Sequence, residues 1–508
     1  MAVQVEQNNQ NPIPPEDFGA SMAQPAVAPP PPAPVAGQPQ VQPQSSLQTA
    51  QNEAVVAPKQ GGRGLVKKLL VIILVLLVLV GVGAAVYFLK DRVGLPGGEV
   101  EESVTVTWWG LWEDEGIVEP LIAEYEAANP GVDIVYEKQA KQDYRERLTS
   151  LFARGEGPDI FRFHNTWVPM LKNHLASLPA SVMGAAEFSQ TYYPVVAADM
   201  TSGTSLVGVP LMFDSLALYI NQDIFESFAK SPPRTWDEFR QVANELTVRD
   251  KDGRIQQAGA ALGTTSNVDH WPEILGLMML QNGVKMSEPT GELAERALTY
   301  YTVFTKEDNV WDNTLPNSTL AFANGKVAMY FGPSWRAFEI EQINPSLDYR
   351  VVVVPQLAKE EPNQTDVAFA TYWVEGVWNK SKVTSAAWDF LKFVSSRESL
   401  TKLYENASKQ RRFGEPYPRV DMAGLLAGDD VVGAFVEQGN YAKSWYLASR
   451  TNDGPTGINT QIIKYFEDGV NGVLGRTSER EALGTVANGV NQVLSAYGLV
   501  SPIVQEEK

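Results

Sequence analysis

The residue types that carry out covalent or metal-assisted chemistry are scarce in this chain and match no known catalytic pattern. Its three histidines, His164, His174 and His270, lack the spacing of a metal site, and cysteine is absent. Motifs of serine hydrolases, phosphate loops, dinucleotide sites and zinc proteases are missing. Glu113 and Asp114 are an acidic pair of the kind that glycosidases use, but among 60 acidic residues such a pair is uninformative. We therefore expect no enzyme activity, no cofactor and no metal.

Tryptophan placement is more informative. Trp108, Trp109 and Trp112 cluster where a first strand meets its loop, and Trp167 follows the strand that ends at Phe163. An indole in such a loop presents a flat apolar face. Sugar rings expose C–H patches that lie on such a face, while their hydroxyls bond to Asp, Asn and His side chains. Core packing explains any single tryptophan equally well, so the cluster is the stronger signal.

Polar side chains stand at the same predicted strand ends. His164, Asn165 and Thr166 follow the strand 159–163 and offer three polar groups, although a turn with locally satisfied side chains is the alternative. Asp214 interrupts the apolar run from 207 to 220. Because burying an unpaired carboxylate is costly, Asp214 must face water, a cation or a ligand, and ligand hydroxyls are favoured over a structural salt bridge.

Alternating strands and helices position these residues. Residues 104–109 and 132–137 read as strands around an amphipathic helix at 116–129, and a helix at 143–153 leads to the strand 159–163. Such a βαβ unit predicts an α/β fold with a parallel sheet, whose ligands bind beyond the carboxyl ends of the strands. Further strands are expected near 207–220, 327–331 and 350–354, and helices at 236–246, 271–281, 291–305, 385–395, 399–405, 459–473 and 479–497.

Length and charge limit the possible functions. The chain has 508 residues and a net charge of −19. Without its N-terminal tail and apolar stretch about 410 residues remain, enough for two lobes of ordinary domain size. The first 90 residues are close to neutral, so this body carries about 20 negative charges, which argues against nucleic acid or an anionic membrane surface as partner.

The N-terminal part differs from the rest in composition. Residues 1–64 are rich in Pro and Gln and are expected to form a disordered tail, with a partner-docking role as the alternative. Residues 69–89 carry no charge, and a helix of that length reaches roughly 31 Å, so we expect one transmembrane helix within 65–90. The basic residues are concentrated before it, which predicts a cytoplasmic tail and an external body. A cleaved signal peptide is the alternative. Residues 91–102 read as a linker.

Several segments, taken together, resemble the extracellular solute-binding proteins of carbohydrate ABC importers, the type that includes maltose-binding protein. They read VTVTWWGLWEDEG, GEGPDIFRFHNTW, GVPLMFDSLALYINQDIF, PPRTWDEF, FANGKVAMYFGPSW and GINTQIIKYFEDGVNGVL. The resemblance covers most of residues 103–500 and implies a type II binding-protein fold, in which two hinged α/β lobes close over a ligand. The implied lobes and hinges are 103–212 with 372–415, 213–366 with 416–508, and the crossing segments 211–216 and 367–373.

The resemblance also implies a ligand site. Its polar contacts would fall near the loop after the first strand and the loop after the GPD strand, its cleft carboxylate matches Asp214, and its GPxW aromatic matches Trp335. The resulting site consists of Trp108, Trp109, Trp112, Glu113, His164, Asn165, Thr166, Trp167, Asp214, Trp271, Trp335, Trp373, Arg412 and Trp445. Where a maltose-binding relative has charged sugar contacts in the first loop, this chain has Gly110, Leu111 and Trp112, so the resemblance does not specify which sugar it binds.

The expected function is a monomeric, membrane-anchored receptor at the cell surface that captures a mono- or oligosaccharide between its lobes and delivers it to the permease subunits of an ABC importer. One alternative is a surface receptor or adhesin that senses sugars without transport. A binder of phosphorylated polyols or peptides is another. A glycoside hydrolase is the third, and it would release reducing ends where a binder would not.

Overall fold

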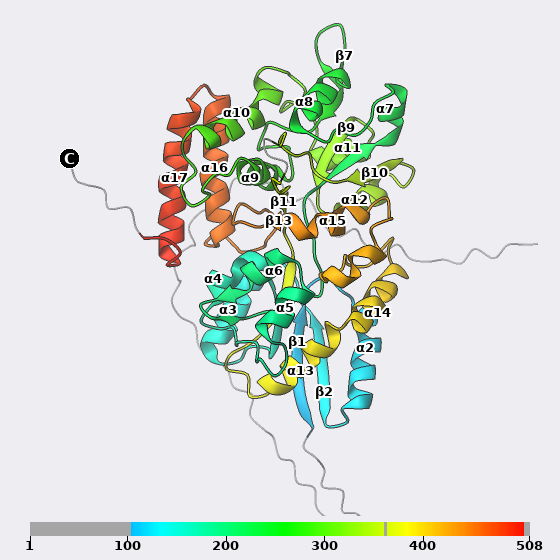
Figure 1. The fold of residues 1–508 in the computed structure, drawn as a ribbon, viewed down its shortest axis with the longest axis vertical. Helices are drawn as coiled ribbons and strands as arrows, with labels where there is room; N and C mark the ends of the chain where they lie inside the picture. The colour runs from blue at the N-terminus through cyan, green and yellow to red at the C-terminus, as the bar shows by residue number, and fades with distance from the viewer. Residues whose placement is uncertain (1–102, 360–362, 502–508) are drawn as a thin grey trace, which may run out of the picture. The chain divides into compact units, whose positions relative to one another are not determined.

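The computed structural model describes residues 103–359 and 363–501, and its strands form two main sheets (Figure 1). The first sheet has the order β12-β3-β1-β2. Its strands are β1 Val104–Gly110, β2 Val132–Lys138, β3 Ile160–His164 and β12 Trp373–Val377. Strand β1 runs parallel to β2 and β3, whereas β12 is antiparallel to β3. The predicted parallel sheet is therefore confirmed, and we call this sheet and its helices the first lobe.

The helix between β1 and β2 shows why the sequence folds this way. Helix α2, Glu115–Ala128, buries Ile117, Val118, Leu121, Ile122 and Tyr125, which recur at helical spacing. The helix ends at Asn129, whose N–H bonds back to the carbonyls of the last turn. Helix α3, Tyr144–Arg154, ends at Gly155 in the left-handed conformation. Both helices lie within a residue or two of their predicted bounds.

The second sheet has the order β10-β6-β9-β8-β7 and forms what we call the second lobe. Its strands are β6 Ala217–Asn221, β7 Val248–Arg249, β8 Ile255–Ala260, β9 Val327–Gly332 and β10 Tyr349–Val352. Strands β6 and β9 are buried throughout, as their continuous apolar sequences predict. Two small pairs complete the strands, β4 Thr201–Ser202 with β5 Ser205–Leu206, and β11 Ala368–Phe369 with β13 Ala442–Lys443.

Helices cover both sheets (Figure 1). The remaining α-helices are α4 Val168–Leu171, α5 Ala185–Thr191, α6 Pro194–Asp199, α7 Gln222–Ser227, α8 Trp236–Glu245, α9 Trp271–Gln281, α10 Glu292–Lys306, α11 Ser318–Ala323, α12 Arg336–Ile343, α13 Thr384–Val394, α14 Arg397–Ser408, α15 Gly433–Glu437, α16 Ile458–Leu474 and α17 Glu479–Ala496. Short 3₁₀ turns lie at η1 Asn165–Trp167, η2 Val420–Leu425 and η3 Gln438–Tyr441.

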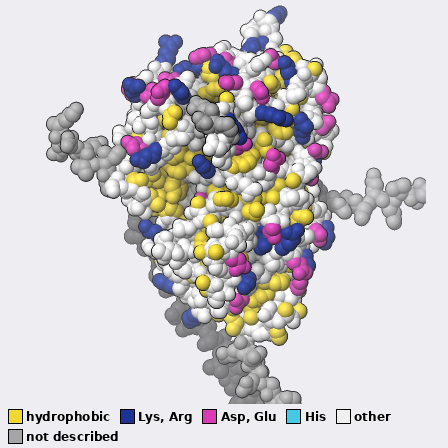
Figure 2. All heavy atoms as spheres, in the orientation of Figure 1, with side chains coloured by type: hydrophobic (Ala, Val, Ile, Leu, Met, Phe, Trp, Pro, Cys, Tyr) yellow, Lys and Arg dark blue, Asp and Glu magenta, His cyan; other side chains and the backbone are white. Residues whose placement is uncertain are grey.

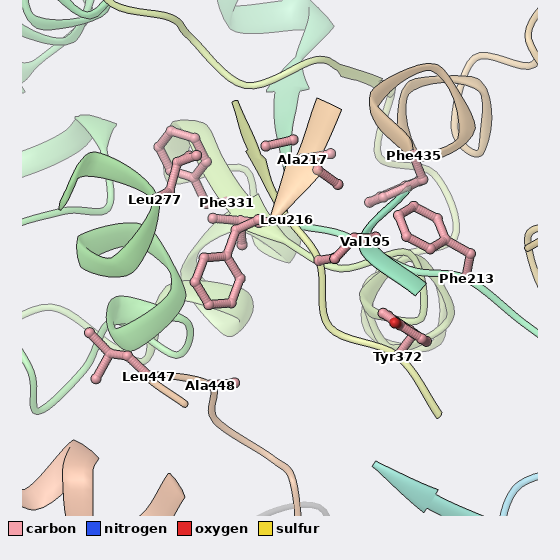
Figure 3. Close-up of a cluster of buried hydrophobic side chains, with 14 of the residues drawn as sticks. Val195, Phe213, Leu216, Ala217, Leu277, Phe331, Tyr372, Phe435, Leu447 and Ala448 are labelled. Carbon is pink, nitrogen blue, oxygen red and sulfur yellow. The ribbon is translucent and has the colours of Figure 1, made fainter. Parts of the chain in front are cut away.

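Segments that run between the two sheets pack side by side. The N–H of Leu216 donates to the carbonyl of Phe369 at 2.8 Å, and the N–H of Ala370 donates to the carbonyl of Lys443 at 2.8 Å. Buried side chains from these segments and both lobes meet here, among them Phe213, Leu216, Phe331, Tyr372, Phe435 and Leu447 (Figure 3). The core is therefore continuous where the chain passes from one sheet to the other.

The predicted fold included one transmembrane helix, and this is corrected here. Among residues 103–359 and 363–501, no helix is both long and apolar enough to cross a membrane. The longest described helices, α16 and α17, alternate buried and exposed positions, because each packs only one face against the body. The predicted tail at 1–64, helix at 65–90 and linker at 91–102 lie outside the described residues.

On the face drawn in Figure 2, acidic and basic side chains are interspersed rather than gathered by sign.

Candidate functional site

Three strand ends of the first sheet bring predicted site residues together. Strands β1 and β3 are parallel, so the residues that follow Gly110 and His164 emerge at the same edge. Trp373 opens β12 directly opposite His164, because β12 is antiparallel to β3. The loop after β1, the turn after β3 and the start of β12 therefore meet at one edge, where open α/β sheets place their ligands.

Three tryptophans pack against one another at this edge. The ring centroids of Trp112 and Trp373 lie 5.5 Å apart at 73°, and those of Trp167 and Trp373 have the same separation and angle. The His164 ring also meets Trp373 edge-on at 5.2 Å. We call Trp112, Trp167 and Trp373 the tryptophan cluster. Trp167 is fully buried, whereas Trp112 and Trp373 are half-buried and keep part of their ring surface exposed.

A buried arginine holds the two segments that carry this cluster. Arg162, on β3, donates through Nε and Nη2 to Glu375 Oε1 at 2.8 and 2.5 Å, and through Nη1 to Glu113. Glu113 follows Trp112 in the chain, and Glu375 lies two residues after Trp373. Glu113 was predicted as a ligand contact, but its carboxylate is paired with Arg162. Burial raises the pKa of Glu375, and Arg162 opposes that shift.

The polar residues after β3 are also bonded within the protein. His164 bonds through Nδ1 to the Thr166 hydroxyl at 2.8 Å and through Nε2 to the Thr371 hydroxyl at 3.0 Å. Thr166 in turn donates to Asn459 Oδ1 at 2.8 Å, at the start of α16. Burial lowers the pKa of His164 to about 3, so its imidazole is neutral at physiological pH.

Asp214 links the two lobes. Its carboxylate accepts hydrogen bonds from the N–H of Ser215 at 2.8 Å, the N–H of Ser334 at 3.0 Å and the hydroxyl of Ser334 at 2.8 Å. Its backbone carbonyl accepts from the N–H of Thr371 at 3.0 Å. Burial raises its pKa to about 7 against these hydrogen bonds. The carboxylate therefore fixes the loop that carries Trp335, and its predicted contact with ligand hydroxyls stays a prediction.

A cavity of about 340 Å³ lies between segments that the resemblance assigns to different lobes. One wall comes from the turn after β3 and from α4 and α6, and the other from residues 444–446 and 497–499. The predicted site residues Asn165, Thr166 and Trp445 line it. Trp445 is half-buried, 5.8 Å from the Tyr446 ring. An indole beside amide and hydroxyl groups suits a polyhydroxylated ligand.

Asp199 also lines this cavity, although it was not among the predicted site residues. Its carboxylate accepts hydrogen bonds from Asn165 Nδ2 and the Tyr372 hydroxyl, both at 2.8 Å, and from the Ser444 hydroxyl. These donors lie 34 to 245 positions away in the chain, so only the folded structure assembles them. A single acid at the end of a short helix carries no signal of its own in the sequence.

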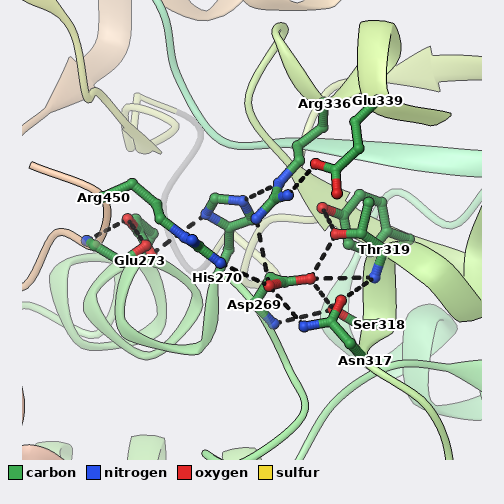
Figure 4. Close-up of polar contacts among 11 residues, drawn as sticks. Asp269, His270, Glu273, Asn317, Ser318, Thr319, Arg336, Glu339 and Arg450 are labelled. Carbon is green, nitrogen blue, oxygen red and sulfur yellow. Dashed lines mark hydrogen bonds and ion pairs between the residues drawn. The ribbon is translucent and has the colours of Figure 1, made fainter. Parts of the chain in front are cut away.

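In the second lobe a polar network is built around Arg336, the residue that follows Trp335 in the chain (Figure 4). The guanidinium of Arg336 lies 4.4 Å from the centroid of the half-buried Trp335 ring. Arg336 Nε donates to His270 Nε2 at 2.9 Å, Nη2 lies 3.3 Å from Asp269 Oδ1, and Nη1 pairs with Glu339. Since His270 accepts on Nε2, its proton sits on Nδ1. One face of the indole is thus occupied by the guanidinium.

Of the fourteen predicted site residues, only Asn165, Thr166 and Trp445 line the cavity, and the four described next lie elsewhere. Trp108 is buried in the first core, with Tyr136 at 4.7 Å and Phe390 at 5.5 Å. Trp109 is half-buried, 6.4 Å from Tyr144. Trp271 is buried at the start of α9. Arg412 pairs with Glu341 and stacks 5.6 Å from the Tyr349 ring. The ligand roles predicted for these four residues stay predictions.

The residues that the structure describes contain no group of three or more His, Asp or Glu side chains that could hold a metal ion. The arrangement at the cavity consists instead of hydroxyl, amide and carboxylate groups around an indole. These groups can bind and orient a polar ligand through hydrogen bonds and stacking.

The family model described as bacterial extracellular solute-binding protein matches residues 120–410, more than half of the chain. The maltotriose-binding protein of Pyrococcus abyssi is 21% identical over 315 residues, which are 58% of this chain and 63% of that protein. The chain thus spans less than two thirds of that relative. The multiple sugar-binding protein of Streptococcus mutans is 21% identical over 321 residues, 60% of this chain and 74% of that protein.

Solved structures show the same fold. The sugar-binding protein MalE of Xanthomonas citri superposes with a TM-score of 0.63 at 20% identity, covering 77% of this chain and 98% of that chain. The GacH receptor of Streptomyces glaucescens, solved without ligand and with acarbose, gives a TM-score of 0.59 at 20% identity over 78% and 99% of the two chains. The two-lobed α/β architecture is therefore that of solute-binding proteins.

Proposed function

Because the chain belongs to the bacterial extracellular solute-binding proteins, as the resemblance predicted, we propose that it binds a carbohydrate between its two lobes outside the cytoplasm and delivers it to an ABC importer. The cavity of about 340 Å³ carries this proposal. Trp445 supplies an apolar surface for a sugar ring, and Asn165, Thr166 and Asp199 supply hydrogen-bonding groups from the opposite wall. The names of the Pyrococcus and Streptococcus relatives support a sugar as the ligand class.

Binding would be coupled to closure of the lobes. The cavity walls come from both lobes, so only a closed arrangement offers all the contacts to one ligand. The half-buried Trp112 and Trp373 of the first lobe and Trp335 of the second add further indole surface. In this proposal they extend the contact surface for a longer oligosaccharide, and the protein binds the sugar without cleaving it.

Titration calorimetry of the purified full-length chain tests the proposal. Maltotriose, mannobiose and cellotriose serve as neutral probes, and at least one should bind with one-to-one stoichiometry and raise the melting temperature. Trp445→Ala should weaken that binding tenfold or more, whereas Phe228→Ala, which removes an exposed aromatic that does not line the cavity, should not. The reducing-end concentration should stay constant during incubation. Absence of heat with every sugar would refute the proposal.

A further inference from the structure

One carboxylate gives the cavity a fixed charge. Asp199 sits at the last position of α6, and its side chain is held by donors from three other segments. Oδ2 accepts from both Asn165 Nδ2 and the Tyr372 hydroxyl, while Oδ1 accepts, among the residues that the structure describes, only from the Ser444 hydroxyl. An ionised carboxylate offers about four acceptor positions. Oδ1 therefore keeps an acceptor position that the protein does not fill.

The charge of Asp199 is not neutralised by a neighbouring cation. Among the ion pairs of residues 103–359 and 363–501, none includes Asp199, although Lys172 lines the same cavity. The Lys172 ammonium donates to the carbonyl of Tyr497 at 3.1 Å, at the opposite wall. A ligand in the cavity thus meets a half-buried negative charge whose position is fixed by three hydrogen bonds.

We infer that Asp199 determines the charge specificity of the site, accepting a hydrogen bond from a sugar hydroxyl or amino group and excluding sugars that carry a carboxylate or phosphate. The inference rests on the proposed function and narrows its ligand class to neutral or amino sugars. A hydrogen bond to an ionised acceptor favours the correct donor by about tenfold or more. An anionic group placed at the same position would instead meet like charge in a partly desolvated cavity.

The charge of Asp199 can also be changed by pH, without a substitution. Burial raises its pKa to about 6, against hydrogen bonds from Ser444, Tyr372 and Asn165. The titratable groups that face it are Tyr372, Tyr446 and, across the cavity, Lys172 and Tyr497, none of which changes charge between pH 5 and 7.5. Below pH 6 the carboxyl becomes neutral and can donate, so discrimination against an anionic sugar should weaken.

The test compares matched neutral and anionic sugars with the full-length protein. Maltotriose, mannobiose and cellotriose are each paired with the same sugar in which one hydroxymethyl group is oxidised to a carboxylate. Calorimetry at pH 7.5 should show the neutral form binding at least tenfold more tightly. In Asp199→Asn this ratio should fall to about threefold or less, because the amide carries no charge. Asp133→Asn, which removes an exposed charge on β2, should keep the wild-type ratio.

The wild-type protein at pH 5 provides a second measurement that does not depend on a variant folding. The ratio of affinities should shrink at pH 5 as it does in Asp199→Asn, since a simple sugar carboxylate remains ionised there. A wild-type ratio that is unchanged at pH 5 and in a folded Asp199→Asn protein overturns the inference while sugar binding, and with it the proposed function, stands. Absence of binding to all six sugars overturns both.

Discussion

Each lobe buries one arginine near its candidate tryptophans, and the two arginines differ in the partners they bind. Arg162 in the first lobe is 2% exposed, and Arg336 in the second is 3% exposed. Arg162 pairs with Glu113 and Glu375, whereas Arg336 pairs with Asp269 and Glu339 and also donates to a histidine. A buried ion pair contributes little net stability, but removal of one partner leaves an uncompensated charge. Substitution of either arginine by an uncharged residue should therefore destabilise the fold.

The difference lies in how each arginine reaches an indole. Arg162 contacts carboxylates whose chain neighbours are Trp112 and Trp373, so it fixes the backbone that presents the tryptophan cluster. Arg336 stacks directly on Trp335. The first lobe positions its aromatic surface through buried charge, and the second through contact between the guanidinium and the ring.

The two networks also differ in how many donors other than the arginine bond to the paired carboxylates. Glu375 Oε2 has no hydrogen-bond partner within the described residues, and both hydrogen bonds to Oε1 come from Arg162. Asp269, by contrast, also accepts from Asn317 Nδ2 at 2.8 Å, Thr319 Oγ1 at 2.5 Å and Arg450 Nη2 at 3.1 Å. Burial raises the pKa of Asp269, but Arg336 and these donors hold it below its usual range. Loss of arginine should therefore cost more in the first lobe than in the second.

Arg162→Met should have the largest effect of the substitutions considered. The methionine fills much of the volume of the arginine stem but takes from two buried carboxylates the cation with which both are paired. Removal of one partner from a buried ion pair costs about 3–5 kcal/mol in free energy of unfolding. Urea denaturation monitored by circular dichroism measures this loss. The triple variant that adds Glu113→Gln and Glu375→Gln should recover part of it, and failure to do so would show that the charges are not the cause.

Arg336→Met should destabilise the protein less, by about 2 kcal/mol, because Asp269 keeps three other donors and Glu339 is partly solvent-exposed. The same urea titration compares it with Arg162→Met. An equal or larger loss of stability for Arg336→Met would show that the other donors to Asp269 do not reduce the cost of removing the arginine.

The first lobe's fold could be predicted because its signals are local. Strand alternation, helical spacing in α2 and the Gly155 stop each depend on residues within one element. The crossing of the chain between sheets followed from the family resemblance rather than from periodicity. Short elements such as α6 and α12 gave too few periodic positions to be recognised.

The site could be predicted only in part, since its contacts join distant segments. The aromatic residues at the strand ends were identified, yet the sequence could not show that Trp108 is core while Trp112 and Trp373 stay half-exposed. Arg162 did carry a signal, because a charge within an apolar strand must be paired. Asp199 carried none, since its three donors come together only in the folded chain.

The dependence of the free energy of unfolding on pH tests the buried histidines of the two lobes, and substitution tests the first-lobe histidine. His164 in the first lobe and His270 in the second are both buried, and burial lowers the pKa of each. The folded state then binds fewer protons than the unfolded state below pH 6.5, so the free energy of unfolding falls as the pH decreases from 6.5 toward 3. For His164, with a pKa of about 3, the loss at pH 5 relative to pH 7.5 is about 2 kcal/mol.

His164→Gln should remove this loss from the pH dependence, although it lowers stability at pH 7.5 by disturbing the hydrogen bonds to Thr166 and Thr371. Urea titrations at pH 7.5, 6.5 and 5 give the difference between the two proteins. His174→Gln, which replaces a less buried histidine, should leave the slope closer to that of the wild type. A parallel pH dependence in wild type and His164→Gln would mean that His164 is not the group that titrates.

Trp335→Ala should have the smallest effect on stability and a clear effect on binding. The comparison of the two effects distinguishes a ligand contact from a structural support for Arg336. The substitution removes a stacking contact with Arg336 of about 1 kcal/mol but leaves the ion pairs of Arg336 in place. If the free face of the ring contacts the sugar, affinity should fall several-fold to tenfold, and Trp335→Phe should recover part of it because a smaller ring still stacks. Calorimetry with the best-binding neutral sugar measures the affinity, and urea denaturation measures the stability. Unchanged affinity with reduced stability would make Trp335 a support for Arg336 rather than a ligand contact, and would leave Trp445 and the tryptophan cluster as the candidate aromatic surfaces of the site.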